Sequence, residues 1–220
     1  MPTDRTIIVG DVHGCIDELN ELIERLRIQP MLDRVIFIGD LINKGPASYQ
    51  VYKRFKQLQA ISILGNHEFR ILRQAKRRAE RDAPYRALKE SFGRKEFKKY
   101  LADIRRWPCF IEDNEFLVVH AGIVPDHPPR ETNPEILVNI RTWDGVGKDL
   151  QNKSNPPWFE GYYGDRLVVF GHWAALGGIV RKNVIGLDTG CVYGKELSAL
   201  VLPNREVISI PAHKIYCPIR

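Results

Sequence analysis

The sequence predicts an α/β fold, an α+β sandwich in which two packed mixed β-sheets are flanked by helices. In the first 65 residues, apolar β-branched runs alternate with segments of helical periodicity, which is typical of βαβ units with parallel strands. From residue 115 onward, further strand-like runs are linked mainly by loops, which indicates a second sheet. At 220 residues the chain can bury one sizeable core, so we expect a single domain over 1–220.

The first half is predicted to contain three buried strands, with a helix after each of the first two. Each strand is a continuous apolar run, as expected of strands covered on both faces. The first helix starts just after Gly14, and Pro46 suits the first turn of the second because its N–H is not needed there. The predicted strands are Thr6–Val9, Arg34–Ile38 and Ala60–Leu64, and the inward-facing helical residues are Ile16, Leu19, Leu22, Ile23 and Leu26, then Val51, Tyr52 and Phe55.

The second half changes style after a helical segment. Residues 68–106 have helical character and few strand signals, and Pro203-Asn204 is a candidate hairpin turn. Residues 124–158 are rich in Pro and Asn and carry little periodicity, so we expect a loop that could act as a lid. The predicted strands are Glu115–His120, Leu167–Phe170, Val184–Asp188, Glu196–Leu202 and Glu206–Pro211.

Metal-ligand residues follow the apolar runs. In open α/β sheets ligands bind outside the carboxyl ends of the strands, so residues placed there should meet at one rim. A single Gly-Asp after a strand is often only a turn with a helix cap. Three such sites in succession, with His or Asn attached, favour a metal site instead. The residues expected at this rim are Asp11, His13, Asp40, Asn66 and His67.

Two later strands also end in histidine. His120 follows one strand and His172 the other. A lone histidine at a strand end is more often a structural residue than a ligand, but the upstream cluster favours ligation for both. Oxygen ligands mixed with imidazoles suit Zn, Mn or Fe more than Ca. A carboxylate such as Asp40 can bridge two ions about 3.5–4 Å apart, a spacing used in phosphoryl displacement.

The order of these motifs resembles a known family. Residues 10–14 read GDVHG, 39–45 GDLINKG, 65–68 GNHE, 120–122 HAG and 171–173 GHW. This order resembles the binuclear metallophosphoesterases of the calcineurin type, in the branch of the Ser/Thr protein phosphatases and the bacterial symmetrical diadenosine tetraphosphatases. The stretches FGHWA at 170–174 and LDTGC at 187–191 look more like the second group. The match runs from Ile8 to about Leu200, and it implies a four-layer sandwich.

The resemblance implies a role for each motif residue and a cofactor of two divalent metal ions. Asp40 matches the bridging aspartate, and His67 matches the general acid that protonates the leaving oxygen. Manganese is expected by analogy, although Fe, Zn, Co or Mg can occupy such sites. The remaining matches are Asp11 and His13 to ligands of the first metal, and Asn66, His120 and His172 to ligands of the second.

Three further positions bear on the substrate and on the acid. Lys44 stands where the family has a phosphate-contacting Arg, and as a point charge it cannot grip phosphate bidentately. Arg141 aligns loosely with a second phosphate-clamping Arg; the alternative is a surface Arg lying beside Trp143. Asn66 is also expected to contact substrate. Asn43 replaces the Asp that pairs with the catalytic His in protein phosphatases, which leaves open what orients His67.

The implied chemistry is hydrolysis of a phosphoric ester or anhydride. A metal-bridging hydroxide attacks phosphorus in line, the metals, Lys44 and Arg141 stabilise the developing charge, and His67 protonates the leaving group. The expected substrates are dinucleoside polyphosphates such as diadenosine tetraphosphate, cut symmetrically to ADP. The alternatives are a phosphoprotein (Ser/Thr or Tyr) phosphatase with the same site, and a non-catalytic binding module, which would not need a general acid.

Composition adds expectations about partners and compartment. Net charge is +6, and basic residues are dense over 70–106 with aromatics among them; this is either a platform for polyphosphate or an RNA 5′ end, or only a solvated helical face. The aromatics Trp143, Trp158, Tyr162 and Tyr163 could stack on adenine or be pinned to the surface. The four cysteines lack metal or disulfide spacing, the first strand begins too early to leave room for a secretory signal, and no run approaches the ~20 residues of a membrane span. We therefore expect a cytoplasmic protein without membrane contact; oligomeric state is left open.

Overall fold

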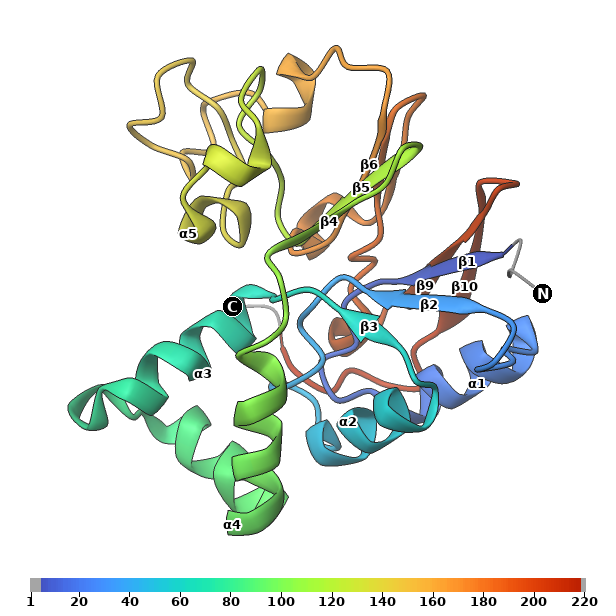
Figure 1. Cartoon of the computed structure of the whole chain (residues 1–220), viewed down its shortest axis with the longest axis vertical. Helices are drawn as coiled ribbons and strands as arrows, with labels where there is room; N and C mark the ends of the chain where they lie inside the picture. Colours follow the sequence, from blue (N-terminus) through green and yellow to red (C-terminus); the bar gives the residue numbers. More distant parts are fainter. Residues whose placement is uncertain (1–4, 219–220) are drawn as a thin grey trace.

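Two five-stranded mixed sheets face each other in the computed structural model, which describes residues 5–218 except for the side chain of Arg78 (Figure 1). In the first sheet β1, β2 and β3 run parallel, and β9 and β10 extend it antiparallel. In strand order this sheet consists of β10 (Glu206–Pro211), β9 (Glu196–Leu202), β1 (Thr6–Val9), β2 (Arg34–Phe37) and β3 (Ile61–Ser62).

The second sheet repeats this plan with a parallel centre. β5, β6 and β8 run parallel, and the edge strands β4 and β7 pair antiparallel with β5 and β8. Its strand order is β4 (Phe110–Glu112), β5 (Phe116–Val119), β6 (Leu167–Phe170), β8 (Val184–Gly186) and β7 (Ile179–Val180). The predicted two-sheet α/β fold is confirmed. The sequence pattern missed β4 and β7 because each is only two or three residues long and is half exposed at a sheet edge.

Helices α1 (Ile16–Leu26) and α2 (Ser48–Gln57) cover the outer face of the first sheet, and α3 (Asn66–Lys76) and α4 (Ala83–Ile104) pack beside α2 (Figure 1). The predicted start of the second helix was too early. The helix begins at Ser48, and Pro46 lies before its N-cap, Ala47. The residues ahead of it form a tight turn in which Asn43 and Lys44 take positive φ, and the Asn43 N–H donates to Ser48 Oγ at 2.9 Å. This turn brings Asn43 and Lys44 to the site described below.

Between the two sheets lies a core of alternate residues from both. Ile8 and Ile36 point into it from the first sheet, and Val118 and Val169 from the second. Their neighbours Ile7, Val35, Leu117 and Val168 are also buried, on the opposite faces of the same strands. Each fully buried aliphatic side chain of this kind contributes about 1.5–3 kcal/mol. Burial on both faces explains why these strands are continuous apolar runs in the sequence.

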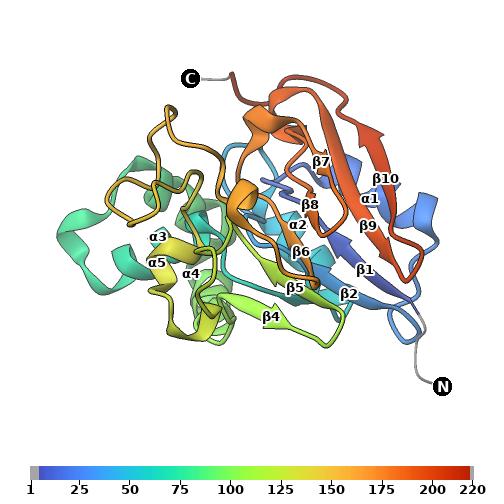
Figure 2. The same cartoon turned by 90° about the horizontal axis from the view of Figure 1, so that it is seen from above.

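A loop-rich layer rather than a helical one covers the outer face of the second sheet. It contains the 3₁₀ turns η2 (Pro129–Glu131) and η3 (Trp158–Gly161) and the short helix α5 (Pro134–Leu137) (Figure 2). Trp158 is fully buried in this layer, and its Nε1 donates to the Ala121 carbonyl at 3.0 Å. A side chain on Gly122 would collide with the indole, because a Cβ there would lie 2.2 Å from Nε1. Stacking of Trp158 on a base, one of the sequence expectations, is therefore wrong.

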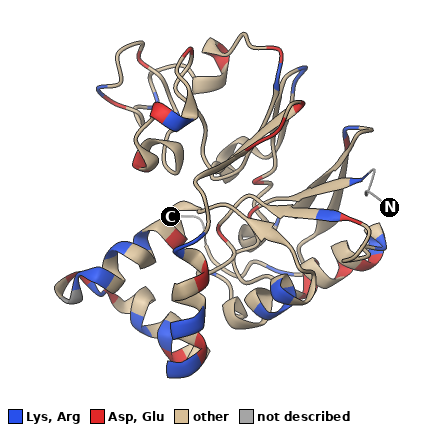
Figure 3. Ribbon diagram, in the orientation of Figure 1, with Lys and Arg blue, Asp and Glu red and all other residues tan. Residues whose placement is uncertain are grey.

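The basic segment 68–106 forms α3, the turn η1 (Arg78–Glu80) and α4, which is interrupted at Gly93. Its Lys and Arg residues are spread along both helices (Figure 3), and most of them are exposed. The interleaved aromatics are not: Tyr85, Phe92, Phe97 and Tyr100 are buried against α2 and the first sheet. The idea that these aromatics stack on nucleic acid bases is therefore wrong. No helix within residues 5–218 has the length and apolar character that a membrane crossing requires.

Candidate metal centre and substrate pocket

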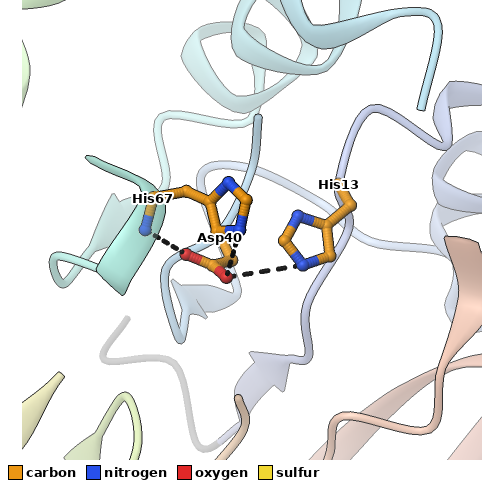
Figure 4. Close-up of side chains that lie close together, drawn as sticks. All are labelled: His13, Asp40 and His67. Carbon is orange, nitrogen blue, oxygen red and sulfur yellow. Dashed lines mark hydrogen bonds and ion pairs between the residues drawn. The ribbon is translucent and has the colours of Figure 1, made fainter. Parts of the chain in front are cut away.

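Polar residues from both sheets converge where the parallel strands end. Each lies one to five residues beyond the carboxyl end of its strand, because the buried run stops there and the chain turns toward the gap between the sheets. Figure 4 shows how three of them, from three different strand ends, point toward one another. The residues brought together are Asp11 and His13 after β1, Asp40 after β2, Asn66 and His67 after β3, His120 after β5 and His172 after β6.

Asp40 lies at the centre of this cluster. Its Oδ2 atom is 3.4 Å from His13 Nε2, 3.6 Å from His120 Nε2 and 4.0 Å from His67 Nε2. Two groups of possible ligand atoms share this carboxylate, one with His13 and His67 and the other with Asp11 and His120. All of these residues are buried except His67, which is partly buried. Asp40 therefore occupies the position expected of a carboxylate between two ion sites.

Asn66 joins the two histidines that come from the second sheet. Its Oδ1 atom lies 3.0 Å from His120 Nε2 and 3.1 Å from His172 Nδ1. The His172 backbone N–H also donates to the Asp11 carboxylate, at 3.2 Å to Oδ2. Through these contacts the ends of β5 and β6 are held against the ends of β1 and β3, so the cluster spans the gap between the sheets.

Strained backbone aims several of these side chains. His13, Asp40 and His172 have φ values of 46°, 50° and 67°, in the left-handed region that non-glycine residues seldom occupy. Glycines make room beside them. A Cβ at Gly65 would lie 2.2 Å from Asp40 Oδ1, and one at Gly171 would lie 2.1 Å from Asp11 Oδ1. These close approaches explain the glycine that precedes Asn66 and the one that precedes His172.

Glu68 holds the loop that carries Asp40. It is fully buried, and its carboxylate accepts the backbone N–H groups of Asp40 at 2.8 Å, Leu41 at 3.1 Å and Gly65 at 3.2 Å. Burial and the charge of Asp40 raise the pKa of Glu68 to about 8. Sequence reasoning gave Glu68 no role, although it is the last residue of the GNHE motif.

The charges in the cluster are balanced against burial. Burial, with repulsion from Asp188 and Asp40, raises the pKa of Asp11 well above its usual range. Burial also opposes ionisation of Asp40, but the surrounding histidines and Lys44 hold the pKa of that carboxyl below its usual range. Burial lowers the pKa of His67 to about 4, an effect that Asp40 only partly offsets. The imidazoles are therefore neutral near pH 7, as ligation requires.

These donors fit divalent cations. His13 Nδ1 donates to the Ile42 carbonyl at 3.0 Å and His120 Nδ1 to the Ile38 carbonyl at 2.8 Å, so the Nε2 atom of each ring keeps a free lone pair. The His120 Nε2 lone pair faces two further acceptors, Asn66 Oδ1 and Asp40 Oδ2. His172 Nε2 is buried and makes no hydrogen bond to any described residue. Acceptors that face one another in a buried space require a cation between them.

Lys44 supplies one such cation from the chain itself. Its Nζ donates to His13 Nε2 at 2.7 Å and lies 5.2 Å from the centroid of the Tyr193 ring. Burial by itself lowers the pKa of Lys44, but Asp40 and Tyr193 overcome this and raise it. The ammonium group therefore neutralises part of the carboxylate charge beside His13.

Asn43 orients His67, which answers the question that the sequence left open. Its Nδ2 donates to His67 Nδ1 at 3.0 Å, and the His67 backbone N–H donates to Asp40 Oδ1 at 3.0 Å. Because Nδ1 accepts this bond, the ring carries its proton on Nε2. That atom is the one directed toward Asp40 (Figure 4).

The cluster forms the floor of an open pocket of about 1240 Å³. One wall is α3 with the start of α4, where Arg70, Gln74 and Ala87 line the space. The loop-rich segment provides another wall through residues that include Arg141 and Lys153. Arg141 Nη1 donates to Gln151 Oε1 at 2.7 Å, while its Nε is buried and finds no acceptor among the described residues. Part of the loop 124–158 therefore borders the site, and its action as a lid stays a prediction.

Sequence reasoning chose the wrong aromatics for this pocket and missed an acid. Within residues 5–218, its lining includes none of the four aromatics that were expected to stack on adenine; Tyr163, for example, is 85% exposed on the surface. Trp173 and Tyr193 line it instead. Asp188 also lines it, at the end of β8, and burial raises its pKa to about 6 against the opposing charge of Lys44. Its place after a strand is the signal that could have identified it.

Comparison with known proteins gives one family match. The family model described as calcineurin-like phosphoesterase matches residues 5–176 of this chain. A crystal structure provisionally described as that of a diadenosine tetraphosphatase superposes with a TM-score of 0.83 at 33% identity, covering 96% of each chain. A protein serine/threonine phosphatase from Saccharomyces cerevisiae superposes with a TM-score of 0.65 over 97% of this chain and 81% of its own, but at 14% identity this likeness concerns the fold alone.

Two curated relatives span nearly the whole chain. The symmetrical bis(5′-nucleosyl)-tetraphosphatase of Methylobacillus flagellatus is 28% identical, and the alignment covers 94% of this chain and 95% of the relative. The asymmetrical bis(5′-nucleosyl)-tetraphosphatase PrpE of Oceanobacillus iheyensis is 30% identical, with 94% of this chain and 92% of the relative covered. Relatives named for symmetrical and for asymmetrical cleavage thus both align with nearly the whole chain.

Proposed function

This chain belongs to the calcineurin-like phosphoesterase family, and from that premise we propose that it hydrolyses dinucleoside tetraphosphates such as diadenosine tetraphosphate, cutting them symmetrically into two nucleoside diphosphates. The pocket carries the proposal. Its floor holds a buried cluster of carboxylates and imidazoles suited to two ions, and its size of about 1240 Å³ suits a ligand larger than a phosphorylated side chain. Cationic side chains in its walls suit a polyphosphate: Lys44, Arg70, Arg141, Lys153 and Lys195.

We propose that the cluster holds two divalent ions that share Asp40, with Asp11 and His13 completing one site, and Asn66, His120 and His172 the other. When bound, such a pair supplies Lewis-acid stabilisation of phosphoryl charge and lowers the pKa of a water molecule. We propose manganese as the metal, since the mixed oxygen and nitrogen donors accept it and the family analogy favours it. The protein's part is to keep four imidazoles neutral and two carboxylates close together, as their burial and contacts require.

The substrate phosphates are proposed to lie against Lys44, Arg141 and Asn66, which all line the pocket. Arg141 Nε has no acceptor within the described residues, so a phosphate oxygen can satisfy it. Lys44 would exchange its bond to His13 for a phosphate oxygen when cations take its place. Both changes place positive charge where the phosphoryl oxygens become more negative in the transition state.

His67 is proposed to be the general acid. Asn43 donates to Nδ1, so the proton sits on Nε2, at the pocket floor. The Nε2–H would donate a hydrogen bond to the departing bridge oxygen and stabilise the charge that develops there as the P–O bond breaks, without leaving an imidazolate. Because Asn43 is neutral and the pKa of His67 is only about 4, the imidazole is not charged at pH 7. A neutral imidazole is a weak acid, which suits a nucleoside diphosphate leaving group better than the alkoxide of a phosphoserine.

Product analysis tests the proposal. Purified protein loaded with Mn²⁺ is incubated with diadenosine tetraphosphate, with a phosphopeptide and with p-nitrophenyl phosphate, and the nucleotides are separated by ion-exchange chromatography. ADP as the sole nucleotide product supports symmetrical cleavage. AMP and ATP as products would instead indicate asymmetrical cleavage, the activity in the name of the Oceanobacillus relative. Phosphate released only from the peptide would support the phosphoprotein phosphatase alternative, which has a likeness in fold alone.

Three sequence expectations stay predictions here. They are a single domain over residues 1–220, action on RNA 5′ ends and a cytoplasmic location. The same assay with 5′-capped RNA as substrate addresses the second. Oligomeric state is left open.

A further inference from the structure

Trp173 has a place in the pocket that the proposed hydrolysis does not use. It directly follows His172, caps the turn η4 (Ala174–Leu176), and lines the pocket while staying half-buried. Part of its ring packs against the core on the outer face of the second sheet. One side of the indole is therefore held by the protein while the rest borders the space where substrate would lie.

Tyr193 lines the same pocket from the turn η5 (Cys191–Tyr193), and the two turns are joined. Lys195 Nζ donates to the Ala174 carbonyl at 3.3 Å. Gly190, which precedes η5, packs closely, because a Cβ there would lie 3.7 Å from Ala174 Cβ. The two aromatic residues thus lie on turns that pack against each other. Tyr193 is already engaged by the Lys44 ammonium, which lies 5.2 Å from its centroid, so Trp173 is the ring left for a ligand.

The other walls offer no comparable surface. Apart from the imidazoles of His67 and His172, the aromatic lining within residues 5–218 consists of Trp173 and Tyr193. The wall of α3 and α4 carries small or aliphatic residues such as Pro84, Ala87 and Ser91. Flat aromatic faces bind nucleobases by stacking, and they accept any base because every base has a π-face.

The neighbouring charges complete the match. Lys44, Arg141 and Lys195 line the same pocket, and Trp173 is bonded in the chain to the proposed metal ligand His172. A nucleotide whose phosphates lie over the metal cluster therefore meets this indole at the next residue along the wall. The site combines an aromatic plate with cations, as nucleotides require.

We infer that Trp173, which lines the same pocket as Tyr193, is the stacking platform for one nucleobase of the substrate. The inference rests on the proposed function, because it assigns part of the same pocket to the nucleoside half of that substrate. Since stacking reads no hydrogen-bonding edge, the platform takes adenine and guanine alike. Diguanosine and diadenosine tetraphosphates should therefore be hydrolysed with similar kcat/KM.

The test compares the wild type with Trp173→Leu and Trp173→Phe on diadenosine tetraphosphate and on p-nitrophenyl phosphate, which has no base. Loss of one stacked base predicts a rise in KM for the dinucleotide of about 5- to 150-fold in Trp173→Leu. In Trp173→Leu, the fold-loss of kcat/KM on the dinucleotide should exceed the fold-loss on p-nitrophenyl phosphate by the same factor. Trp173→Phe should restore most of the lost kcat/KM on the dinucleotide. Equal losses on both substrates, or no loss on the dinucleotide, would overturn the platform.

Binding separates failure of the inference from failure of the proposed function. ADP and inorganic tripolyphosphate are titrated into each variant, and dissociation constants are measured by calorimetry. The platform predicts that Trp173→Leu raises the dissociation constant of ADP at least about 5-fold more than that of tripolyphosphate. This result is expected even if the wild type does not hydrolyse the dinucleotide. Equal affinities of wild type and variant for ADP would contradict it. Tyr163→Leu is the matched control, since Tyr163 is 85% exposed and lies outside the pocket lining. This variant should bind both ligands with the affinity of the wild type.

Discussion

The floor and the outer wall of the pocket are built in different ways. We define the floor as the buried ligand candidates Asp11, His13, Asp40 and His120, of which Asp40 lines the pocket itself, and the outer wall as the pocket-lining residues within 70–91 and 141–157. Every floor residue is at most 3% exposed, and each is fixed by backbone hydrogen bonds, positive φ or a close glycine. The outer wall is held by exposed ion pairs such as those of Arg73 with Glu80 and Glu135, worth about 0.2–1 kcal/mol.

This difference teaches where the chain can change. Groups of the floor share partners, so altering one disturbs the metal site, the fold or both. Side chains of the outer wall act singly and over water, so altering one adjusts affinity. Substitutions in the two regions should therefore differ in size and in kind.

Replacing the carboxylate at the centre of the floor should have the largest effect. Asp40→Asn removes the negative charge that both proposed ions share, while the side chain keeps nearly the same size. We expect the amount of bound metal to fall and kcat to decrease by more than about 100-fold. The comparison is with the loss of a residue that only hydrogen-bonds to a metal ligand, which typically costs about 10- to 100-fold. Elemental analysis and steady-state kinetics check this, with exposed Asp165→Asn as the control. Full activity in Asp40→Asn would end the bridging assignment.

His67→Ala, beside the floor, should separate chemistry from metal binding. The variant should keep its metal content and fold, and lose about 10²–10⁴ in kcat on substrates with poor leaving groups. The loss should shrink as the leaving group becomes more acidic, as in p-nitrophenyl phosphate. A normal rate on an unactivated phosphate ester would remove His67 from the acid role.

Glu68→Ala should test whether the floor depends on its buried support. Three backbone N–H groups would lose their acceptor, and each unsatisfied buried group costs about 1–3 kcal/mol. We expect the free energy of unfolding to fall by at least about 3 kcal/mol, measured by urea denaturation, together with weaker metal binding. Glu90→Ala, at an exposed position on α4, should change stability little. Equal stabilities of the two variants would show that Glu68 is not a support.

The pH dependence of stability should report the buried histidines. His67 has a folded pKa of about 4 against 6.5 unfolded, so the unfolded chain binds the extra proton between these values. Metal-free protein should therefore lose stability as pH falls from 6.5 to about 4, by up to about 3 kcal/mol for this residue. Thermal unfolding in the presence of a chelator measures it, and His67→Gln should flatten the profile. An unchanged slope in that variant would place the titration elsewhere.

The smallest effects are expected at the outer wall. Lys153→Ala should raise the KM for a dinucleoside tetraphosphate by about 2- to 5-fold, and less at high salt, because exposed charges are screened. Lys98→Ala, on α4 outside the pocket lining, is the matched control and should leave KM unchanged. If salt left the wild-type KM unchanged, the basic wall would have no part in binding polyphosphate.

The floor was predictable from the sequence because its residues follow strands whose patterns are local. Asp11, Asp40 and His120 each follow an apolar run, and strand ends of parallel sheets meet by topology. The fold followed from the same runs. The short edge strands β4 and β7 did not, because two or three residues carry no period.

The outer wall was less predictable because long-range packing decides which side chains reach the pocket. Trp158 and Trp173 cannot be told apart by residue type. Nevertheless, the folded chain buries Trp158 against Gly122, whereas Trp173 borders the site. The aromatics of 68–106 point inward because they are buried in one apolar cluster with residues of α2 and the first sheet. Glu68 escaped notice because its three partners lie on backbone that only the folded chain brings near.

The most direct test of the central claim is metal stoichiometry measured together with activity. Protein purified without chelator is analysed for transition metals, exhaustively chelated, assayed, and assayed again after Mn²⁺ is restored. The account predicts two divalent ions per chain, loss of hydrolysis on chelation and recovery with the metal. Active protein without stoichiometric metal, or hydrolysis that survives chelation, would contradict it.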